Sequence, residues 1–313
     1  MKKLTLYGIF LCIVILISGC QEGRISEDES KRISEMEKKS ILIKTESKKF
    51  REVLQSKPVT FLLLGIDSRG EEKSRTDSIL VAQYDAINRT LKLASLMRDS
   101  YVKIPGQEQY DKLNQAYFIG GEDLLIQTIK DNFNMDIDYA VTIDFEGFIQ
   151  VMDLIVPDGL TVHVKKEMID DMNLSMKPGF HSLHGEDLLK YVRFRHDEES
   201  DFGRVRRQQE VLLQIKEKIY KEMTTLEGFA KLPNIVDTAL QYVESDLKVS
   251  EILTLGSTMF LQPIEKVETI RIPVSGGFTN QTYPHAGAVL ELDFSKNKEA
   301  LMNFFSEPKA VNE

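Results

Sequence analysis

The sequence predicts an α/β protein with a three-layer α-β-α architecture and a mixed central sheet. From Val59 onward, short apolar runs rich in Val, Ile, Leu and Thr are interspersed with amphipathic segments. These segments do not alternate cleanly, which favours some antiparallel pairing within the sheet. Because no linker-like composition interrupts the region, we expect residues 51–313 to form one domain.

Six runs have the length and composition of strands. They are Val59–Ile66, Ile79–Tyr84, Leu91–Leu96, Ala140–Ile143, Leu160–Val164 and Val267–Val274. Other segments carry apolar residues at helical spacing, as Leu125, Ile129 and Phe133 do. These predicted helices are Glu122–Phe133, Phe145–Leu154, Gly185–Tyr191, Asp201–Met223, Asn234–Val243, Ser250–Leu261 and Lys296–Phe305.

The first twenty residues have the pattern of an export signal. Two lysines precede the apolar run Leu4–Ile17, and a Ser-Gly pair before Cys20 resembles a bacterial lipobox. We expect residues 1–19 to be removed as a signal peptide, so that a lipidated Cys20 tethers the protein to the outer face of the cell membrane. The alternative is an uncleaved transmembrane anchor, although the apolar run is short against the ~20 residues of a usual span.

Residues 20–50 are dense in charge and carry few apolar positions, which predicts a solvated spacer or a marginal helix. The whole chain of 313 residues has a formal net charge of −9 and only two cysteines. An acidic protein lacks the broad basic surface that nucleic acid requires. With Cys12 inside the signal and Cys20 lipidated, no internal disulfide would form.

Two aspartates mark the ends of neighbouring predicted strands. FLLLGIDSRG places Asp67 at the carboxyl end of a buried run, and SRTDSILV places Asp77 just before the next run. Strand ends joined by a short loop converge, so the two carboxylates would share one Mg²⁺ with water and phosphate oxygens. The alternative is a pair of turn-capping aspartates; the nearby Arg75 favours the metal site.

A further Arg-Asp pair follows the third apolar run. LMRDS places Arg98 and Asp99 at the end of Leu91–Leu96, where they would stand at a pocket mouth. The same dipeptide is also common as a surface ion pair. KLNQAY adds Lys112 and Asn114, which fit a polar site or the start of a helix equally well.

The most informative stretch is DEESDFGRVRRQQ, at the start of a long apolar-periodic run. If Ser200 or Asp201 caps a helix there, Arg204 and Gln208 lie one turn apart on one face. The unpaired amides and positive dipole of a helix N-terminus favour anions. The sequence therefore predicts an anion site beside Arg204 and Gln208.

Arg193 and Arg195 stand just upstream, either as part of this site or as solvated charges balanced by the acidic residues that follow. Arg206 points away from its helical neighbours, and we expect it to be exposed. Gly203 would allow close approach of the backbone near the helix start. Six arginines suggest a site for a multiply charged phosphate group: Arg75, Arg98, Arg193, Arg195, Arg204 and Arg207.

Nucleophilic catalysis is poorly supported by the sequence. We find no nucleophile elbow, Cys/His pair or Walker loop, and the five histidines have no recognisable partner serine. Residues that bind and neutralise phosphate supply most of what phosphoryl transfer requires, because its loose transition state needs positioning and charge stabilisation.

Seven motifs between Val59 and Tyr220, taken in order, resemble those of the LytR-CpsA-Psr family of Gram-positive cell-wall enzymes. They are LLLGIDSR, SRTDSILV, SLMRDSYV, KLNQAY, IDFEGF, HSLHGEDLLKYVRFRH and SDFGRVRRQQ. The resemblance implies transfer of an anionic glycopolymer, such as wall teichoic acid or capsular polysaccharide, from an undecaprenyl-pyrophosphate carrier to a peptidoglycan muramic acid hydroxyl. It also implies a long apolar pocket for the prenyl chain in residues 51–313, the catalytic domain.

The family's metal-binding aspartates correspond to Asp67 and Asp77, which would hold Mg²⁺ or Mn²⁺. Its pyrophosphate-binding residues correspond to Arg75, Arg98, Arg193, Arg195, Arg204 and Gln208. Arg75 and Arg98 would also act in catalysis, with Asp99 as the candidate proton acceptor. Two alternatives stay open: hydrolysis of the same lipid pyrophosphates, and a membrane-tethered polyprenyl-phosphate binder that regulates cell-wall synthesis without catalysis.

Overall fold

The structure, a computed structural model, describes residues 27–67, 74–223 and 225–306. The chain divides into two units, Met1–Glu46 and Ser47–Glu313. Helix α2 (Glu27–Leu54) begins in the first unit and ends in the second, so the helical alternative for the charged spacer is correct for these residues. The expected signal peptide and Cys20 lie outside the described residues.

A mixed sheet forms the centre of the second unit, as the sequence predicted. Its strands, in spatial order, are β10 (Lys266–Ile272), β3 (Thr90–Leu96), β2 (Arg75–Asp85), β1 (Val59–Asp67), β6 (Tyr139–Asp144) and β9 (Val243–Ser245). The β1–β2, β2–β3 and β6–β9 pairs are antiparallel, whereas β1–β6 and β3–β10 are parallel. Strand β1 is apolar on both faces because both faces of the central sheet are covered.

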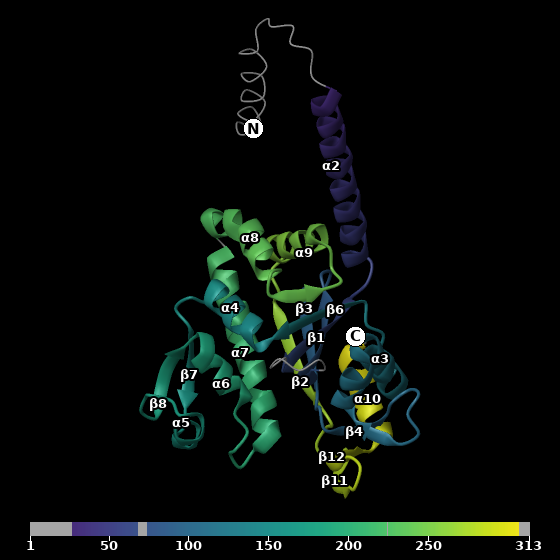
Figure 1. The fold of residues 1–313 in the computed structure, drawn as a ribbon, viewed down its shortest axis with the longest axis vertical. Helices are drawn as coiled ribbons and strands as arrows, with labels where there is room; N and C mark the ends of the chain where they lie inside the picture. Colours follow the sequence, from purple (N-terminus) through teal and green to yellow (C-terminus); the bar gives the residue numbers. More distant parts are fainter. Residues whose placement is uncertain (1–26, 68–73, 224, 307–313) are drawn as a thin grey trace, which may run out of the picture. The chain divides into compact units, whose positions relative to one another are not determined.

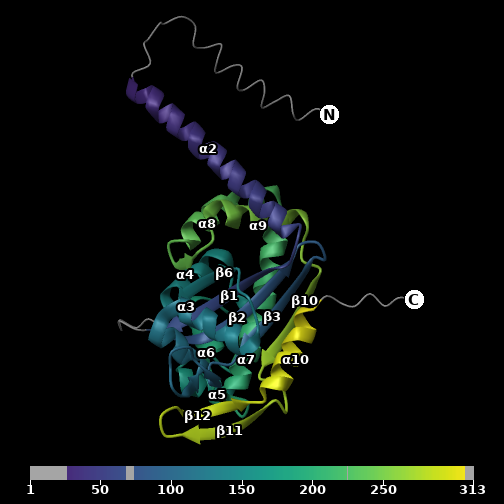
Figure 2. The same ribbon diagram turned by 90° about the vertical axis from the view of Figure 1, so that its right-hand side faces the viewer.

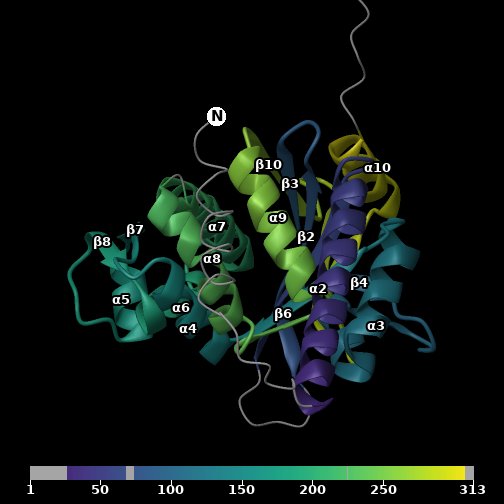
Figure 3. The same cartoon turned by 90° about the horizontal axis from the view of Figure 1, so that it is seen from above.

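Helices cover the two faces of this sheet (Figures 1 and 3). One face packs against α3 (Leu113–Phe133) and α10 (Phe294–Phe305), and the other against α4 (Phe145–Ile155) and α7 (Ser200–Met223). Helix α6 (Gly185–Arg193) packs against α4 and α7. Leu62 and Leu64 of β1 point into the core beside α3, whereas Phe61 belongs to the core on the opposite face. The period-two alternation of a strand thus divides one apolar run between two cores.

Smaller elements extend this framework. They are α5 (Lys166–Met172), α8 (Leu226–Ala239), α9 (Val249–Leu261), the pair β7 (Leu160–Val164) and β8 (Gly179–Leu183), and a second sheet of β11 (Phe278–Tyr283), β12 (Gly287–Leu292), β4 (Ser100–Lys103) and β5 (Tyr110–Lys112). The β11–β12 hairpin projects at the end of the unit opposite α8 and α9 (Figure 2). We did not predict β4, β5, β8, β9, β11 or β12, because these short strands lack a distinctive apolar pattern.

Two predicted helices differ from the structure. The predicted helix Asn234–Val243 is wrong in its bounds: α8 begins after Thr225, which caps it by accepting from the Gly228 amide at 3.0 Å, and Pro233 lies inside it. The predicted start at Glu122 follows a kink at Gly120 and Gly121, where Gly121 has φ +68°. Helix α3 therefore has a first segment that the sequence analysis missed.

Across the described ranges, no helix combines the length and the apolar character that crossing a membrane demands.

Candidate active site

The site begins where β1 ends and β2 starts. In their antiparallel register Asp67 lies opposite Arg75, whereas Ile66 pairs with Thr76 and Gly65 with Ser78. Asp77 is therefore the extra residue of a β-bulge. A bulge re-aims side chains that strict alternation would place on opposite faces, and both Asp77 and Ser78 line the same cavity.

Arg98 follows β3 and is held by carboxylates. Its Nη1 donates a hydrogen bond to Oδ1 of Asp77, and its Nε lies 3.7 Å from Oδ2 of Asp99. Lys112 binds the other oxygen of Asp99 at 2.8 Å. Burial lowers the pKa of Arg98, but Asp77, Asp201 and Asp99 outweigh this effect and the pKa ends above its usual value. Arg98 therefore carries a fixed positive charge.

KLNQAY contributes to the site through two residues. Besides the ion pair of Lys112, the backbone amide of Asn114 donates to the carbonyl oxygen of Arg98 at 3.2 Å. The Asn114 side chain is buried, and its Oδ1 has no hydrogen-bond partner among the described residues. The start of α3 and the turn after β3 thus form one unit that positions Arg98.

Arg204 lies on the second turn of α7 and is only 4% exposed. Its Nη2 donates to Oδ2 of Asp201 at 2.9 Å, so the Asp201 side chain pairs with this arginine. Within the part of the chain that the structure describes, Oδ1 of Asp201 has no hydrogen-bond partner. Helix α7 begins at Ser200, so Asp201 lies inside its first turn and pairs with Arg204. Burial lowers the pKa of Arg204, the Asp201 carboxylate opposes this effect, and the neighbouring Arg98 adds to the lowering.

Arg193 and Gln208 approach the same place from α6 and α7. Nη2 of Arg193 lies 4.0 Å from Oδ2 of Asp67, and its guanidinium stacks 3.9 Å from the centroid of the Phe145 ring. Oε1 of Gln208 accepts from the Ser78 hydroxyl at 3.2 Å. The structure therefore brings strands β1 and β2 together with helices α6 and α7 at one site.

The remaining predicted residues lie at the margin. Arg75 is exposed and lies 5.0 Å from the centroid of the Phe118 ring. Arg195 is exposed in the segment between α6 and α7, and no ion pair or hydrogen bond joins it to the cluster within the described part of the chain. We therefore place Arg195 outside the assembled group.

The two arginines between Arg204 and Gln208, Arg206 and Arg207, form ion pairs outside the site. Arg207 is 1% exposed, pairs with Asp197 at 2.9 Å and donates to the carbonyl oxygen of Phe194. It therefore belongs to the core and not to the predicted phosphate site. Arg206 is exposed, as predicted, and it forms ion pairs with Glu199 and Glu210. Gly203 is also explained, because a Cβ there would lie 2.9 Å from Cβ of Glu199.

An apolar cavity of about 340 Å³ opens beside this cluster, between the sheet and helices α4, α6 and α7. Most of its lining is aliphatic or aromatic, including Leu63, Phe148 and Leu189. Polar residues stand at one side of it: Asp77, Ser78, Asp144, Arg193 and Gln208. The cavity thus suits a molecule with an apolar body and a charged end.

Asp67 and Asp77 have the chemistry of magnesium ligands, since Mg²⁺ takes one or two carboxylates from a protein and completes its shell with water and phosphate oxygens. No group of three or more His, Cys, Asp or Glu side chains with metal-binding geometry occurs among the described residues. Both aspartates also face arginines. The two carboxylates fit a metal that is shared with a phosphate ligand.

Sequence analysis missed Asp144 and Phe145. Asp144 ends β6, lies opposite Ile66 in the parallel register, and caps α4 by accepting from the Gly147 amide at 2.7 Å. The rule that selected Asp67, a carboxylate at the carboxyl end of a buried strand, would also have selected Asp144. Phe145 supplies the ring face on which Arg193 stacks. This contact depends on the packing of α4 against α6, so the sequence alone did not indicate it.

Known proteins resemble this chain over most of its length. Regulatory protein MsrR of Staphylococcus aureus (strain COL) is 37% identical over 249 residues, which cover 80% of this chain and 75% of that protein. Polyisoprenyl-teichoic acid–peptidoglycan teichoic acid transferase TagU of Bacillus cereus is 31% identical over 281 residues, covering 88% of this chain and 90% of that protein.

Solved structures resemble it as well. TagT bound to LI-WTA has a TM-score of 0.63 and 28% identity, covering 80% of this chain and 92% of that one. The LytR-CPS2A-psr family protein YwtF (TagT) with bound octaprenyl pyrophosphate lipid has a TM-score of 0.57 and 27% identity, covering 80% and 91%. Residues 21–301 match the LytR_cpsA_psr family as a whole. The chain therefore belongs to the LytR-CpsA-Psr family.

Proposed function

We propose that this protein is a phosphotransferase that moves an anionic glycopolymer from an undecaprenyl-pyrophosphate carrier to a muramic acid hydroxyl of peptidoglycan. The observation that carries the proposal is the contact between the apolar cavity and the arginine cluster. Arg193 and Asp77 line the cavity, and Asp77 is hydrogen-bonded to Arg98. A carrier with a long hydrocarbon tail and a pyrophosphate head has the two chemistries that these surfaces recognise.

The named relatives support the choice of substrate. TagU is named a teichoic acid transferase, and TagT has been observed with LI-WTA and with octaprenyl pyrophosphate lipid. Wall teichoic acid is therefore our first candidate for the polymer. The carrier's tail would occupy the cavity between the sheet and α4, α6 and α7.

In the proposed reaction, the acceptor hydroxyl oxygen forms a bond to the phosphorus that carries the glycopolymer. The bond from this phosphorus to the bridging oxygen breaks, and undecaprenyl phosphate leaves. The hydroxyl proton passes to a carboxylate or to solvent, and Asp99 remains the candidate acceptor. Lys112 and Arg98 hold the Asp99 carboxylate in place.

The arginines would supply most of the catalysis. Charge on the oxygens of the transferring group is spread in a loose transition state, so fixed cations in a partly buried site stabilise it without reorganising. Arg98 suits this role because it is charged and anchored by Asp77. Arg75 and Arg193 are more exposed and would reach the outer phosphate oxygens.

Asp67 and Asp77 would hold Mg²⁺ or Mn²⁺, which when bound supplies further neutralisation of the pyrophosphate oxygens. Arg193, 4.0 Å from Asp67, would keep that carboxylate directed toward the site.

We also propose that the mature chain begins at a lipidated Cys20 and that residues 20–50 space the catalytic domain from the outer face of the membrane. The apolar run before Cys20 supports this proposal, and an uncleaved N-terminal anchor is the alternative.

Product analysis tests the function directly. Purified protein is incubated with lipid-linked teichoic acid and peptidoglycan oligomers, and the products are identified by mass spectrometry. Transfer gives a phosphodiester between polymer and peptidoglycan together with undecaprenyl phosphate. Release of the polymer phosphate to water in the presence of acceptor would replace the proposal by hydrolysis, and intact substrates would leave only a binding role.

A further inference from the structure

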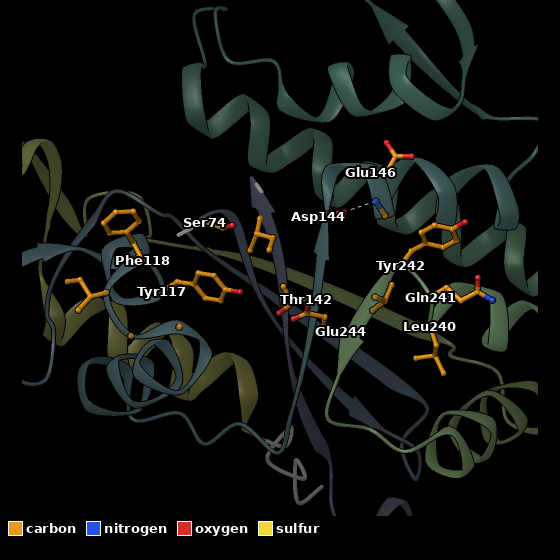
Figure 4. Close-up of a pocket in the computed structure, with 16 residues that line it drawn as sticks. Ser74, Tyr117, Phe118, Thr142, Asp144, Glu146, Leu240, Gln241, Tyr242 and Glu244 are labelled. Carbon is orange, nitrogen blue, oxygen red and sulfur yellow. Dashed lines mark hydrogen bonds between the residues drawn. The ribbon is translucent and has the colours of Figure 1, made fainter. Parts of the chain in front are cut away.

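A second and larger cavity, of about 720 Å³, adjoins the site on the other side of the strand ends. Figure 4 shows its walls, which come from the first segment of α3, the ends of β1 and β6, the first turn of α4 and the residues of β9 with those before it. Asp144 and Val243 line both this cavity and the apolar one. A ligand here would therefore meet a lipid pyrophosphate at the junction of the two.

The charge of this cavity is opposite to that of the arginine cluster. Its lining contains three carboxylates, those of Asp144, Glu146 and Glu244, and no Lys, Arg or His among the described residues. A fourth carboxylate, Glu122, lies just behind the wall and accepts from Thr142 at 3.3 Å. An anionic polymer would be repelled from such a surface, whereas a neutral molecule rich in hydroxyl donors would find acceptors.

Aromatic side chains complete the lining. Tyr117 and Phe118 stand on the first segment of α3, and Tyr242 faces them across the opening, beside Asp144 and Glu146 (Figure 4). Burial, followed by Glu244 and Glu122, raises the pKa of Tyr117, which favours its neutral hydroxyl. Flat apolar rings combined with carboxylates match the two kinds of surface on a sugar ring, its C–H faces and its hydroxyl edge.

Glycines at two points allow this shape. A Cβ at Gly147 would collide with the carbonyl oxygen of Tyr242, so only glycine lets the segment before β9 approach the start of α4. Gly121, at φ +68° and ψ −156°, kinks α3 and separates the turn that bears Tyr117 and Phe118 from the rest of the helix. The cavity is thus built by specific backbone geometry.

We propose that this acidic aromatic cavity is the acceptor subsite, which holds the neutral N-acetylglucosamine residues that neighbour the acceptor muramic acid in a glycan strand. The inference rests on the proposed transfer reaction and deepens it by assigning its second substrate to a place. Donor and acceptor are separated by charge: the anionic carrier binds the arginines, and the uncharged sugar binds the carboxylates. Ile66 and Ser74, which line the cavity next to Asp67 and Arg75, mark where the acceptor hydroxyl reaches the phosphorus.

Two variants test the assignment with little risk to the fold. Tyr242→Ala removes a ring that is 38% exposed, and Glu244→Gln removes the charge of an exposed carboxylate. Tyr220→Ala, at a tyrosine that is 45% exposed on α7, and Glu299→Gln, exposed on α10, are the matched controls.

The first measurement is direct binding of chitotetraose, an uncharged N-acetylglucosamine oligomer, by calorimetry without any donor. We expect wild type and both controls to bind it, and each cavity variant to bind at least about tenfold more weakly, the loss of roughly one good contact. Equal affinity in all five proteins, or loss in the controls as well, would overturn the assignment. The assignment would also be overturned if chitotetraose gave no binding heat and Mg²⁺ or Ca²⁺, titrated alone, did. The cavity would then be a cation site.

The second measurement is the KM of transfer for peptidoglycan oligomers and for the lipid donor. The cavity variants should raise the acceptor KM about tenfold while the donor KM stays close to that of wild type. A change confined to the donor KM would refute the acceptor subsite and leave the transferase intact. If wild type shows no transfer yet chitotetraose binds in the cavity, the proposed function fails and the sugar site stands.

Discussion

Arg207 and Asp197 form an ion pair of 2.9 Å in which both side chains are buried, 1% and 7% exposed. The pair holds the segment between α6 and α7 against the core. The guanidinium also donates to the carbonyl oxygen of Phe194. The neighbouring Arg204 pairs with Asp201 beside Arg98. Two arginines three residues apart on α7 therefore have different roles: Arg207 fixes the loop that leads into the helix, whereas Arg204 belongs to the site.

Replacing Arg207 by Met should destabilise the protein strongly. The substitution leaves Asp197 buried without its partner, which costs about 3–5 kcal/mol in other proteins. Urea unfolding of the purified domain measures the loss. Arg206→Met, at an exposed ion pair, should cost no more than about 1 kcal/mol, and an equal loss in both variants would contradict the structural role of Arg207.

The arginines of the cluster should act through geometry as well as charge. Arg→Lys at Arg98, Arg193 or Arg204 keeps the charge but loses the planar fork that meets paired phosphate oxygens. Transfer should fall by at least about tenfold, or 1.4 kcal/mol of transition-state stabilisation. Arg206→Lys is the control and should retain the wild-type rate. Equal tolerance at all four positions would indicate a diffuse electrostatic patch.

Removing either metal-binding candidate should strongly slow transfer. We expect Asp67→Ala and Asp77→Ala to lower the rate by roughly two orders of magnitude or more, because a metal provides several kcal/mol of charge stabilisation. Lipid binding should fall only partly, since the arginines and the apolar cavity remain. The measurement compares the wild-type transfer rate with added Mg²⁺ and with excess chelator. Full activity in chelator would show that transfer needs no metal.

A larger side chain in the apolar cavity should discriminate among lipid donors by tail length. Val151 lines the cavity from α4 and is half-buried, so Val151→Phe narrows the slot at modest cost to the fold. The KM should rise for donors with long prenyl tails and change little for donors with short ones. Equal effects on both donors would show that the tail binds elsewhere.

The native N-terminus should be a lipidated Cys20. Mass spectrometry of the protein extracted from membranes should find a diacylglycerol-modified peptide that starts at this residue, because the preceding apolar run is short for a span. Recovery of the segment from Met1 to Gly19 in the membrane-bound protein would instead establish an uncleaved anchor.

The sequence by itself determined five of the six strands of the central sheet, all except β9, and the ends at which polar residues gather. The runs Val59–Ile66 and Leu91–Leu96 are apolar enough to be buried strands in any arrangement, and a short connection forces Asp67 and Arg75 together. Arg98 follows from the same rule. These features depend on local periodicity and on the short reach of the chain.

Only the tertiary structure decided which side chains point where. The bulge at Asp77 comes from the register of β1 against β2. The burial of Arg207 depends on its ion pair with Asp197, which lies in the loop before α7. Asp144 lies between two cavities because α4 packs beside β6. Each depends on contacts between segments distant in sequence, so a local pattern names the candidate residues and long-range packing selects among them.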